Sequence, residues 1–561
     1  MDVHLLGVWD YVVISTVLLI SSGIGIYCRF TGGKQSTVGE YLFADSNMHV
    51  VPVAFSLMAS TVSAISLLGN ASEIYTFGLQ FIILFFGYVI VAPIASYVYL
   101  PIFFQLRVTS VYEYLGKRYG TIARLIGSLA YSLQMIFYSG LVLYAPALAL
   151  EAVTGLSKNV AILSIGLVCT FYSSIGGMKA VIITDVFQSL LMFGALASIP
   201  IFAIRQSGSL AEIWRVAKEG NRTDLLNFEI DPTVRHSWFS LIIGGGITFL
   251  SQNCVSQTQV QRYLTVKDLK RARQALWLQF PIIVGLNLCT SLSGLAIYAR
   301  YYDCDPVSNG SITSSDQLMP YYVVDSTGHI PGLSGLFVAG IFSGSLSSLS
   351  SSLNCLAAVT LEDYLKPVYH KLTGSHPTDS QLSFYSKAIS FGGGIICIGF
   401  AFLAQLLGGV LQAALTVIGI LGGPLLGIFT LGMCTINANQ KGAIMGFFSG
   451  LTVCLWAAFG RPRPGLPKLP VRVDACHQIT AQHNVLQNES REYFWLYRLS
   501  YLYNGFIGFI CTLVVGFMVS WISNKFTGLA LENTDPDLFV PCVARRIKER
   551  VKCNQINMRS L

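Results

Sequence analysis

Charged residues are scarce in this chain of 561 residues. Asp, Glu, Lys and Arg make up only 11% of it, whereas ordinary soluble domains carry about 25%. The sequence also has no HExxH, GxSxG or Walker motif, so the chemistries that these motifs support are not expected. We therefore predict neither a soluble domain nor an enzyme. The net charge of +8 implies no nucleic-acid partner, because most basic residues fall in loops and in the C-terminal tail.

The thirteen cysteines show no metal-ligand spacing. Most of them lie in apolar segments, where a free cysteine behaves as a small apolar residue. Cys304 and Cys476 lie instead in loops that we place outside the membrane. These two could form a disulfide bond, and the sequence alone does not decide whether they do.

Long apolar segments are what the chain has in abundance. Hydrophobic residues make up 53% of it, and they recur in segments of about 20 residues, each long enough to cross a bilayer. The expected fold class is an all-α polytopic membrane protein, with one transmembrane domain over residues 1–525 and a cytoplasmic tail over residues 526–561. We predict about thirteen spans, at residues 9–28, 50–75, 79–105, 122–152, 158–176, 181–203, 237–255, 276–299, 332–360, 385–407, 410–436, 441–460 and 500–524.

The orientation follows from the basic residues. Thirteen spans put the two termini on opposite sides, and an extracellular N-terminus leaves most Lys and Arg inside, as the positive-inside rule requires. Arg262 is counted here among the residues of an inner loop. The sequons at Asn221, Asn309 and Asn488 fall in predicted outer loops and are expected glycosylation sites, whereas the sequon at Asn70 lies at a span and is expected to be unused.

A run of hydroxyls occupies the predicted span 332–360, where seven of the residues 343–352 are serine. Polar groups at bilayer depth usually face a partner, a cavity or an ion path. Gly344, Ser347 and Ser348 are spaced i, i+3 and i+4, so they share one helix face. A carbonyl and two hydroxyls without a carboxylate suit a weakly held monovalent cation. The alternative is that the serines only permit close packing or bond back to i−4 carbonyls.

Two predicted spans carry signs of interruption. The middle of span 50–75 is rich in Ser and Thr, and span 237–255 contains Gly244, Gly245 and Gly246 followed by SQN. Three glycines weaken a helix locally, and irregular backbone at this depth is tolerated only when it is buried in protein or lines a cavity. Interrupted spans at corresponding positions of two halves indicate an inverted-repeat transporter, with repeats at about 50–203 and 237–436. The alternative is that these glycines serve only helix packing.

Asp185 is a carboxylate just inside the predicted span 181–203. An intramembrane Asp is a functional candidate by default, and Gln188 stands three residues further along the same face. The alternative is an interfacial residue that bonds a neighbouring helix end. Tyr138 could bring a hydroxyl to the core from span 122–152.

Several stretches of the sequence resemble a known family. YSSIGGMKAV at 172–181, continuing to TDVFQ at 184–188, is similar to a signature of the sodium–solute symporters, and residues 432–450 resemble the second signature. Three further stretches resemble the branch of iodide, monocarboxylate and multivitamin carriers, namely YAPAL at 144–148, DQLMPY at 316–321 and NCLAAVTLED at 354–363. The resemblance covers residues 8–525.

The resemblance implies a LeuT-type fold of inverted five-helix repeats that binds sodium between the second and ninth spans. By position, the ligands would be the carbonyls of Ala59, Val62 and Gly344 and the hydroxyls of Ser347 and Ser348. Relatives that move more than one sodium use the position of Asp185, which here would act with Gln188, Tyr138 and Ser63. Sodium would be the coupling ion, and no other cofactor and no obligatory protein partner are expected.

The predicted substrate is a small organic monoanion. Sugar carriers of the family place Asn and His where this chain has Thr61 and Ser66, and the iodide carrier has Gln at the second of these positions, so both substrates are disfavoured. No Lys or Arg was identified at mid-membrane depth to pair with a carboxylate. The predicted lining residues are Thr61, Ser66, Tyr88, Phe249 and Gln412.

The resulting hypothesis is a plasma-membrane symporter that imports a monocarboxylate-like anion with sodium by alternating access. A multivitamin carrier for biotin or pantothenate, or an iodide carrier, are the alternatives within the family. A solute sensor that binds without transporting would normally carry a signalling domain that this chain lacks. A channel would need a filter motif, and none is evident.

Overall fold

The computed structural model describes residues 6–30, 38–154, 157–405, 409–476, 493–527 and 535–549. Within these ranges every regular element is a helix, as the predicted fold class requires. The long apolar helices are α1 (Val8–Phe30), α8 (Thr121–Thr154), α9 (Lys158–Ser207), α13 (Leu269–Arg300), α15 (Leu333–Thr360), α17 (Asp379–Ala404), α18 (Val410–Cys434), α19 (Gln440–Phe459) and α21 (Tyr503–Thr527). A further long helix consists of α5 (Ile83–Ile94), a π-turn and α6 (Leu100–Leu106).

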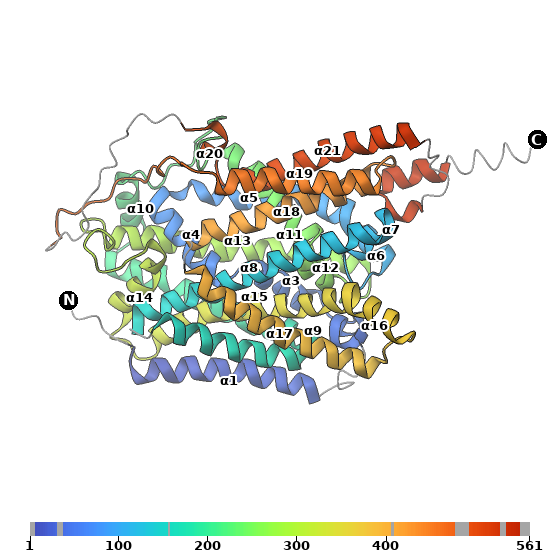
Figure 1. The fold of residues 1–561 in the computed structure, drawn as a ribbon. Coiled ribbons are helices and arrows are strands. Elements are labelled where there is room, and N and C mark those ends of the chain that lie inside the picture. The colour runs from blue at the N-terminus through green and yellow to red at the C-terminus, as the bar shows by residue number, and fades with distance from the viewer. Residues whose placement is uncertain are drawn as a thin grey trace, which may run out of the picture.

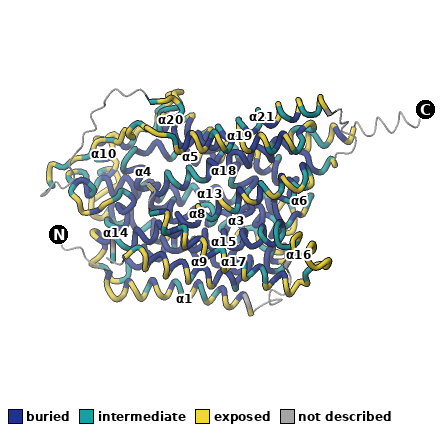
Figure 2. The backbone as a smooth tube through the Cα atoms, in the orientation of Figure 1, coloured by how far each residue is buried: buried dark blue, intermediate teal, exposed yellow. Residues whose placement is uncertain are grey.

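The shorter helices connect or interrupt these long ones. They are α2 (Val38–Phe43), α3 (Val50–Thr61), α4 (Ala64–Phe77), α7 (Glu113–Tyr119), α10 (Leu210–Glu219), α11 (Gly245–Cys254), α12 (Gln257–Tyr263), α14 (Leu318–Thr327), α16 (Lys366–Thr373) and α20 (Trp495–Arg498). The long helices run roughly side by side, with α1 along one edge of the molecule and α19 and α21 along the opposite edge (Figure 1). Buried residues fill the middle, and exposed residues follow the outer helices and the loops at both ends (Figure 2).

The number of spans is supported only in part. Ten described helices are long and apolar enough to cross a membrane, and the bent pair α3 and α4 would make an eleventh crossing. Helix α9 contains 50 residues, more than twice the roughly 20 that one crossing needs. Gly177 interrupts it with a φ of 62°, and a Cβ there would lie 2.9 Å from the Tyr41 ring. Residues 158–176 and 181–203 are thus separate segments, but the total of thirteen stays a prediction.

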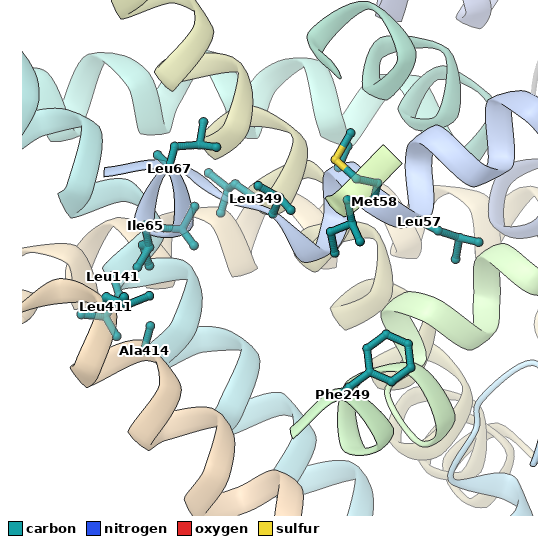
Figure 3. Close-up of a cluster of buried hydrophobic side chains, with 14 of the residues drawn as sticks. Leu57, Met58, Ile65, Leu67, Leu141, Phe249, Leu349, Leu411 and Ala414 are labelled. Atoms are coloured by element: carbon teal, nitrogen blue, oxygen red, sulfur yellow. The ribbon is translucent and has the colours of Figure 1, made fainter. Parts of the chain in front are cut away.

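The second predicted span is broken in its middle. Helix α3 ends at Thr61 and α4 begins at Ala64, with a bend of 60° between them. Val62 and Ser63 between the two helices have extended backbones. Apolar side chains hold both pieces in place: Leu57 and Met58 of α3, Ile65 and Leu67 of α4, and Leu349 of α15 belong to one buried cluster (Figure 3).

The interruption of the seventh predicted span is real, but its predicted position is wrong. The helix continues through Gly244, Gly245 and Gly246 as a π-turn followed by α11. The break comes at Val255 and Ser256, between α11 and α12. The glycines serve packing, which was the alternative reading: a Cβ on Gly245 would lie 2.3 Å from Leu84 Cδ1, and one on Gly244 would lie 2.6 Å from the Leu502 carbonyl oxygen. Glycine spacing therefore marks a close helix contact here, not a helix end.

One end of the molecule is fixed by a disulfide bond between Cys304 and Cys476. The Tyr75 hydroxyl near the end of α4 donates to the Asp305 carboxylate at 2.7 Å. The Asp305 amide donates in turn to the Arg472 carbonyl. The loop after α13 and the segment before α20 are thus tied to the end of the broken helix.

Two predicted glycosylation sites lie at this same end. Asn221 is exposed and adjoins Arg222, whose carbonyl accepts from the Leu79 amide. Asn309 is half-buried, five residues after Cys304. Asn488 lies outside the described residues. Asn70 is buried and donates to Asn287 at 2.8 Å, in keeping with the expectation that its sequon is unused.

Part of the predicted tail packs against the helices at the opposite end. Helix α21 extends to Thr527, and Phe539 further on is buried. The Arg118 guanidinium lies 5.0 Å from the centre of the Phe539 ring, and the Val540 amide donates to the Met433 carbonyl at 3.1 Å. Residues 535–549 therefore cover the ends of α7 and α18, although they follow the last apolar helix.

Candidate functional site

Helix α15 brings its serines to the break between α3 and α4. All of the residues 337–359 are buried. Gly344 is the first residue of the face that it shares with Ser347 and Ser348, and it lies directly against the break. A Cβ added to Gly344 would lie 3.0 Å from the Ala64 amide nitrogen. A helix end leaves its last carbonyls without intrahelical partners. The α3 terminus therefore supplies acceptors beside this face, with Ala59 in its last turn and Val62 at the bend.

The hydroxyls of α15 are almost all satisfied within the protein. Ser343, Ser350, Ser351 and Ser352 bond to carbonyls three or four residues earlier, and Ser345 bonds to the Val142 carbonyl. For all of these serines except Ser345 the structure favours the alternative of local back-bonding, and Ser345 instead joins α15 to α8.

Ser348 is different. Its hydroxyl oxygen is buried and has no hydrogen-bond partner within the described residues. A buried polar group without a partner calls for an explanation such as a bound ion or water. The unsatisfied hydroxyl lies on the face that adjoins the broken helix, where the predicted cation ligands are.

Asp185 of α9 reaches the same region but is held by an arginine. Its Oδ1 accepts from the Ser347 hydroxyl at 2.6 Å, and its Oδ2 accepts from the Ser56 hydroxyl at 2.5 Å and from Arg262 Nη2 at 3.2 Å. The side chains of Asp185 and Arg262 are both fully buried. The ion pair compensates the charge of Asp185, so burial of this carboxylate does not by itself require a second cation.

Arg262 corrects two sequence-based expectations. It was placed in an inner loop, and no buried cation was identified in the core, yet its guanidinium is fully buried and also bonds to Ser56, Ser351 and the Thr258 carbonyl. The residue lies in α12, just after the displaced break of the seventh span. The local sequence contains one sign of this burial. Arg262 stands four residues after Thr258 in a short segment that also carries the apolar residues Val260 and Tyr263.

The other residues predicted for a second cation divide into separate contacts. The Tyr138 hydroxyl donates to the Ser63 hydroxyl at 3.2 Å, which ties α8 to the break. Gln188 is fully buried one turn after Asp185 on α9. The structure thus joins Asp185 to Ser347 and Tyr138 to Ser63, and the assignment of all four to one ion stays a prediction.

Three of the predicted substrate-lining residues line one small cavity. Thr61, Ser66 and Tyr88 surround a space of about 40 Å³, which has room for a few water molecules but not for an organic anion. The lining residues therefore have to separate when a solute enters. The complete lining is Thr61, Val62, Ser66, Asn70, Phe81, Leu84, Phe85, Tyr88, Ile283, Asn287, Leu411 and Leu415, and each of these described residues is uncharged.

Phe249 and Gln412 lie beside this cavity rather than in its wall. The Phe249 ring stands 5.1 Å from the Tyr88 ring, between centroids, and so supports a lining residue. The Gln412 side chain accepts from Arg235 Nη1 at 3.1 Å. Sequence reasoning found the right region of α18, but Leu411 and Leu415 are the residues that line the cavity.

A second cavity of about 40 Å³ lies on the other side of the break. Its lining includes Ser60, Tyr138, Gln252, Gln259 and Ser352. Gln259 donates to the hydroxyls of Ser60 and Thr61. Ser60 lines this second cavity, whereas Thr61 lines the first. The end of α3 therefore separates two small, partly polar cavities.

Comparison with known proteins agrees with this architecture. A sequence model of the sodium:solute symporter family matches residues 41–450. A Drosophila melanogaster protein described as a sodium-dependent multivitamin transporter is 50% identical, over 97% of this chain and 93% of its own length. The sodium-coupled monocarboxylate transporter 1 of Homo sapiens is 42% identical, over 94% of this chain and 89% of its own.

Solved structures show the same fold. A Na⁺-coupled sialic acid symporter in a substrate-bound outward-open state superposes with a TM-score of 0.76 at 25% identity, covering 92% of this chain and 98% of that one. The closed form of Mhp1, a nucleobase-cation symporter, gives a TM-score of 0.52 at 12% identity, with 88% and 95% covered. The fold is thus the LeuT type, and the repeat boundaries at about 50–203 and 237–436 stay a prediction.

Ser348→Ala tests the cation site without any knowledge of the solute. An ion that binds only the folded state raises its stability, so the melting temperature of the purified protein is expected to be higher in sodium chloride than in choline chloride. Ser348→Ala should remove most of this difference. Ser343→Ala is the matched control, because that hydroxyl bonds to the Ala339 carbonyl. Equal sodium responses in both variants would contradict the assignment.

Asp185→Asn tests the buried ion pair. Removing one partner of such a pair costs about 3–5 kcal/mol, because the other charge stays buried. Surface biotinylation should therefore show little Asp185→Asn protein, and adding Arg262→Gln should restore most of it. If Asp185 also binds a second sodium, the double variant should take up solute with a sodium Hill coefficient near one. A wild-type surface level of the single variant would contradict the pairing, and unchanged cooperativity in the double variant would exclude the ligand role.

Proposed function

The chain belongs to the sodium:solute symporter family, and from this membership and its central site we propose that it imports a small organic monoanion across the plasma membrane. It is a multi-pass membrane transporter that couples solute movement to sodium.

One observation carries the proposal: the broken helix contributes to two sites at once. One side of the break adjoins Gly344 and the unsatisfied hydroxyl of Ser348. The adjacent residues Thr61, Val62 and Ser66 line the cavity. A sodium ion held by Ala59, Val62, Gly344, Ser347 and Ser348 would order the same backbone that contacts the solute.

This shared backbone gives a mechanism for coupling. If sodium raises the affinity for solute, the solute must raise the affinity for sodium equally. Each charge that crosses 100 mV contributes about 2.3 kcal/mol, and a tenfold sodium gradient adds about 1.4 kcal/mol. Two sodium ions with one monoanion would therefore accumulate solute steeply and carry inward current. Serine hydroxyls and carbonyls bind weakly enough to release sodium into the cytoplasm.

The cavity favours a single negative charge with a modest apolar body. Its wall combines Tyr88, Phe85 and leucines with the hydroxyls of Thr61 and Ser66. Ser66 lies in the first turn of α4, so the positive end of that helix dipole points into the cavity region. No charged side chain lines the cavity among the described residues.

Two relatives suggest which monoanions to test first. One is named for monocarboxylates and the other for multivitamins, and biotin and pantothenate each carry one carboxylate. A multivitamin carrier is the second candidate, favoured by the higher identity to the Drosophila protein. Iodide lacks a body that would use the apolar wall.

The disulfide supports an orientation with the N-terminus outside and the C-terminus inside. Disulfides persist in oxidising compartments, so the end that carries Cys304–Cys476 is assigned to the outside. Asn221 and Asn309 lie at this end, and the buried Phe539 segment lies at the other.

An uptake panel tests the solute. Cells that express the chain should take up at least one of labelled lactate, butyrate, nicotinate, biotin and pantothenate in sodium but not in choline, with saturation and inward current. Iodide should be taken up at least tenfold less efficiently. Sodium-dependent binding without uptake would point to a sensor, and current without saturation would point to a channel.

The glycosylation pattern tests the orientation. Removing the sequon at Asn221, Asn309 or Asn488 should increase gel mobility wherever that site is used, because these loops are assigned to the outside. Removing the sequon at Asn70 should change nothing, because this side chain is buried. An epitope in the loop of Asn309 that labels only after permeabilisation would overturn the orientation.

A further inference from the structure

A second buried ion pair caps the cavity at the disulfide end. Arg235 Nε and Nη2 donate to Glu73 Oε1 at 2.8 and 2.7 Å, and His236 Nε2 lies 3.1 Å from the same oxygen. Only 10% of the Arg235 side chain and 9% of the Glu73 side chain are exposed. Glu73 stands one turn beyond Asn70, which lines the cavity. The pair therefore forms the next layer between the cavity and the outer end.

The guanidinium of Arg235 is held in a fixed plane. The Phe77 ring lies 4.2 Å and the Tyr501 ring 4.7 Å from its central carbon, so both contribute cation–π attraction. Its Nε and Nη2 donate to Glu73, and its Nη1 donates to Gln412 Oε1 at 3.1 Å. The charge of Arg235 is thus oriented, and one of its nitrogens bonds only to a neutral amide oxygen of α18 among the contacts described.

The contact between Arg235 and Gln412 exists while α18 packs against α4. Leu411, the residue before Gln412, lines the cavity. It also packs closely on α4, since a Cβ added to Gly69 would lie 2.6 Å from the Cβ of Leu411. A solute that enters from the outer end has to separate α18 from α4 here, because a cavity of about 40 Å³ is too small for an organic anion. That separation withdraws Gln412 and frees Nη1 of Arg235.

We propose that Arg235 is an outer capture site for the carboxylate of the solute, and that Gln412 takes the place of that carboxylate when the outer end closes. The inference rests on the proposed monoanion function. An amide oxygen and a carboxylate oxygen can accept the same bond from Nη1, but the carboxylate adds the Coulomb attraction between opposite charges and so displaces the neutral amide. The anion is therefore drawn to the mouth by Arg235 and passes inward as Gln412 returns, which reconciles an uncharged cavity with an anionic solute.

Glu73 sets how strongly Arg235 attracts the carboxylate of the solute. The carboxylate compensates the guanidinium charge, so the captured anion is released instead of being trapped. Removing the Glu73 charge should strengthen capture, and removing both charges should abolish it. A purely structural ion pair predicts a different pattern, in which both changes reduce the amount of folded protein and neither alters the discrimination between an acid and its amide.

The experiment compares Glu73→Gln with the double variant Glu73→Gln/Arg235→Gln in full-length protein in cells. The probe is whichever acid of the uptake panel wild type transports best, and the competitor is its uncharged carboxamide. In the double variant the KM for the acid should rise about tenfold, because one charge-assisted hydrogen bond is lost. The inhibition constant of the carboxamide should stay within about twofold of its wild-type value, because an uncharged amide gains little from the Arg235 charge. In Glu73→Gln the KM for the acid should be equal or lower. Surface biotinylation normalises both.

Gln412→Glu and Gln412→Leu form a matched pair that keeps the ion pair intact. A carboxylate at residue 412 competes permanently for Nη1, so Gln412→Glu should raise the KM for the acid about tenfold, and Gln412→Leu should not raise it. The capture site is refuted if the double variant keeps the wild-type KM, or if acid and carboxamide lose affinity together. Absence of uptake of every acid by wild type would instead refute the proposed function, and this inference with it.

Discussion

The break between α3 and α4 is the constraint on which the rest of the structure depends. Backbone groups freed at membrane depth have no water to bond and must be satisfied by protein or by a bound species. Gln259 and Gln279 donate to the Leu57 carbonyl near the end of α3, and the Val62 amide donates to the Met58 carbonyl. The side-chain hydroxyls at the break are bonded as well, Ser63 by Tyr138, and Ser60 and Thr61 by Gln259. Gly344 is needed because the Ala64 amide comes within 3.0 Å of the position that a Cβ would occupy.

Two buried ion pairs flank this centre and differ in what they join. Asp185–Arg262 joins α9 to α12 and also bonds Ser56 of α3 and Ser347 of α15, so it ties both broken helices to the serine face. Glu73–Arg235 joins α4 to the segment before α11 and, through Gln412, to α18. The first pair is fully buried, whereas the second retains slight exposure, in keeping with a contact that solute can reach.

Much of this arrangement was predictable from the sequence. Segment length and hydrophobicity located the apolar helices, and the density of serine on one face of 332–360 identified the helix that meets the break. Thr61, Ser66 and Tyr88 were assigned to one site and do line one cavity. The glycines at 244–246 were misread because a glycine weakens an isolated helix and equally permits close packing, and composition does not separate these effects.

The sequence by itself determined which segments are apolar, which faces are polar and which family the chain resembles, because these properties depend on residues close together along the chain. Only the tertiary structure decided the partners. Asp185 and Arg262 are 77 positions apart, and Arg235 and Gln412 are 177 apart. An arginine looks alike in sequence whether it faces the cytoplasm or a carboxylate, since its burial depends on which helices surround it.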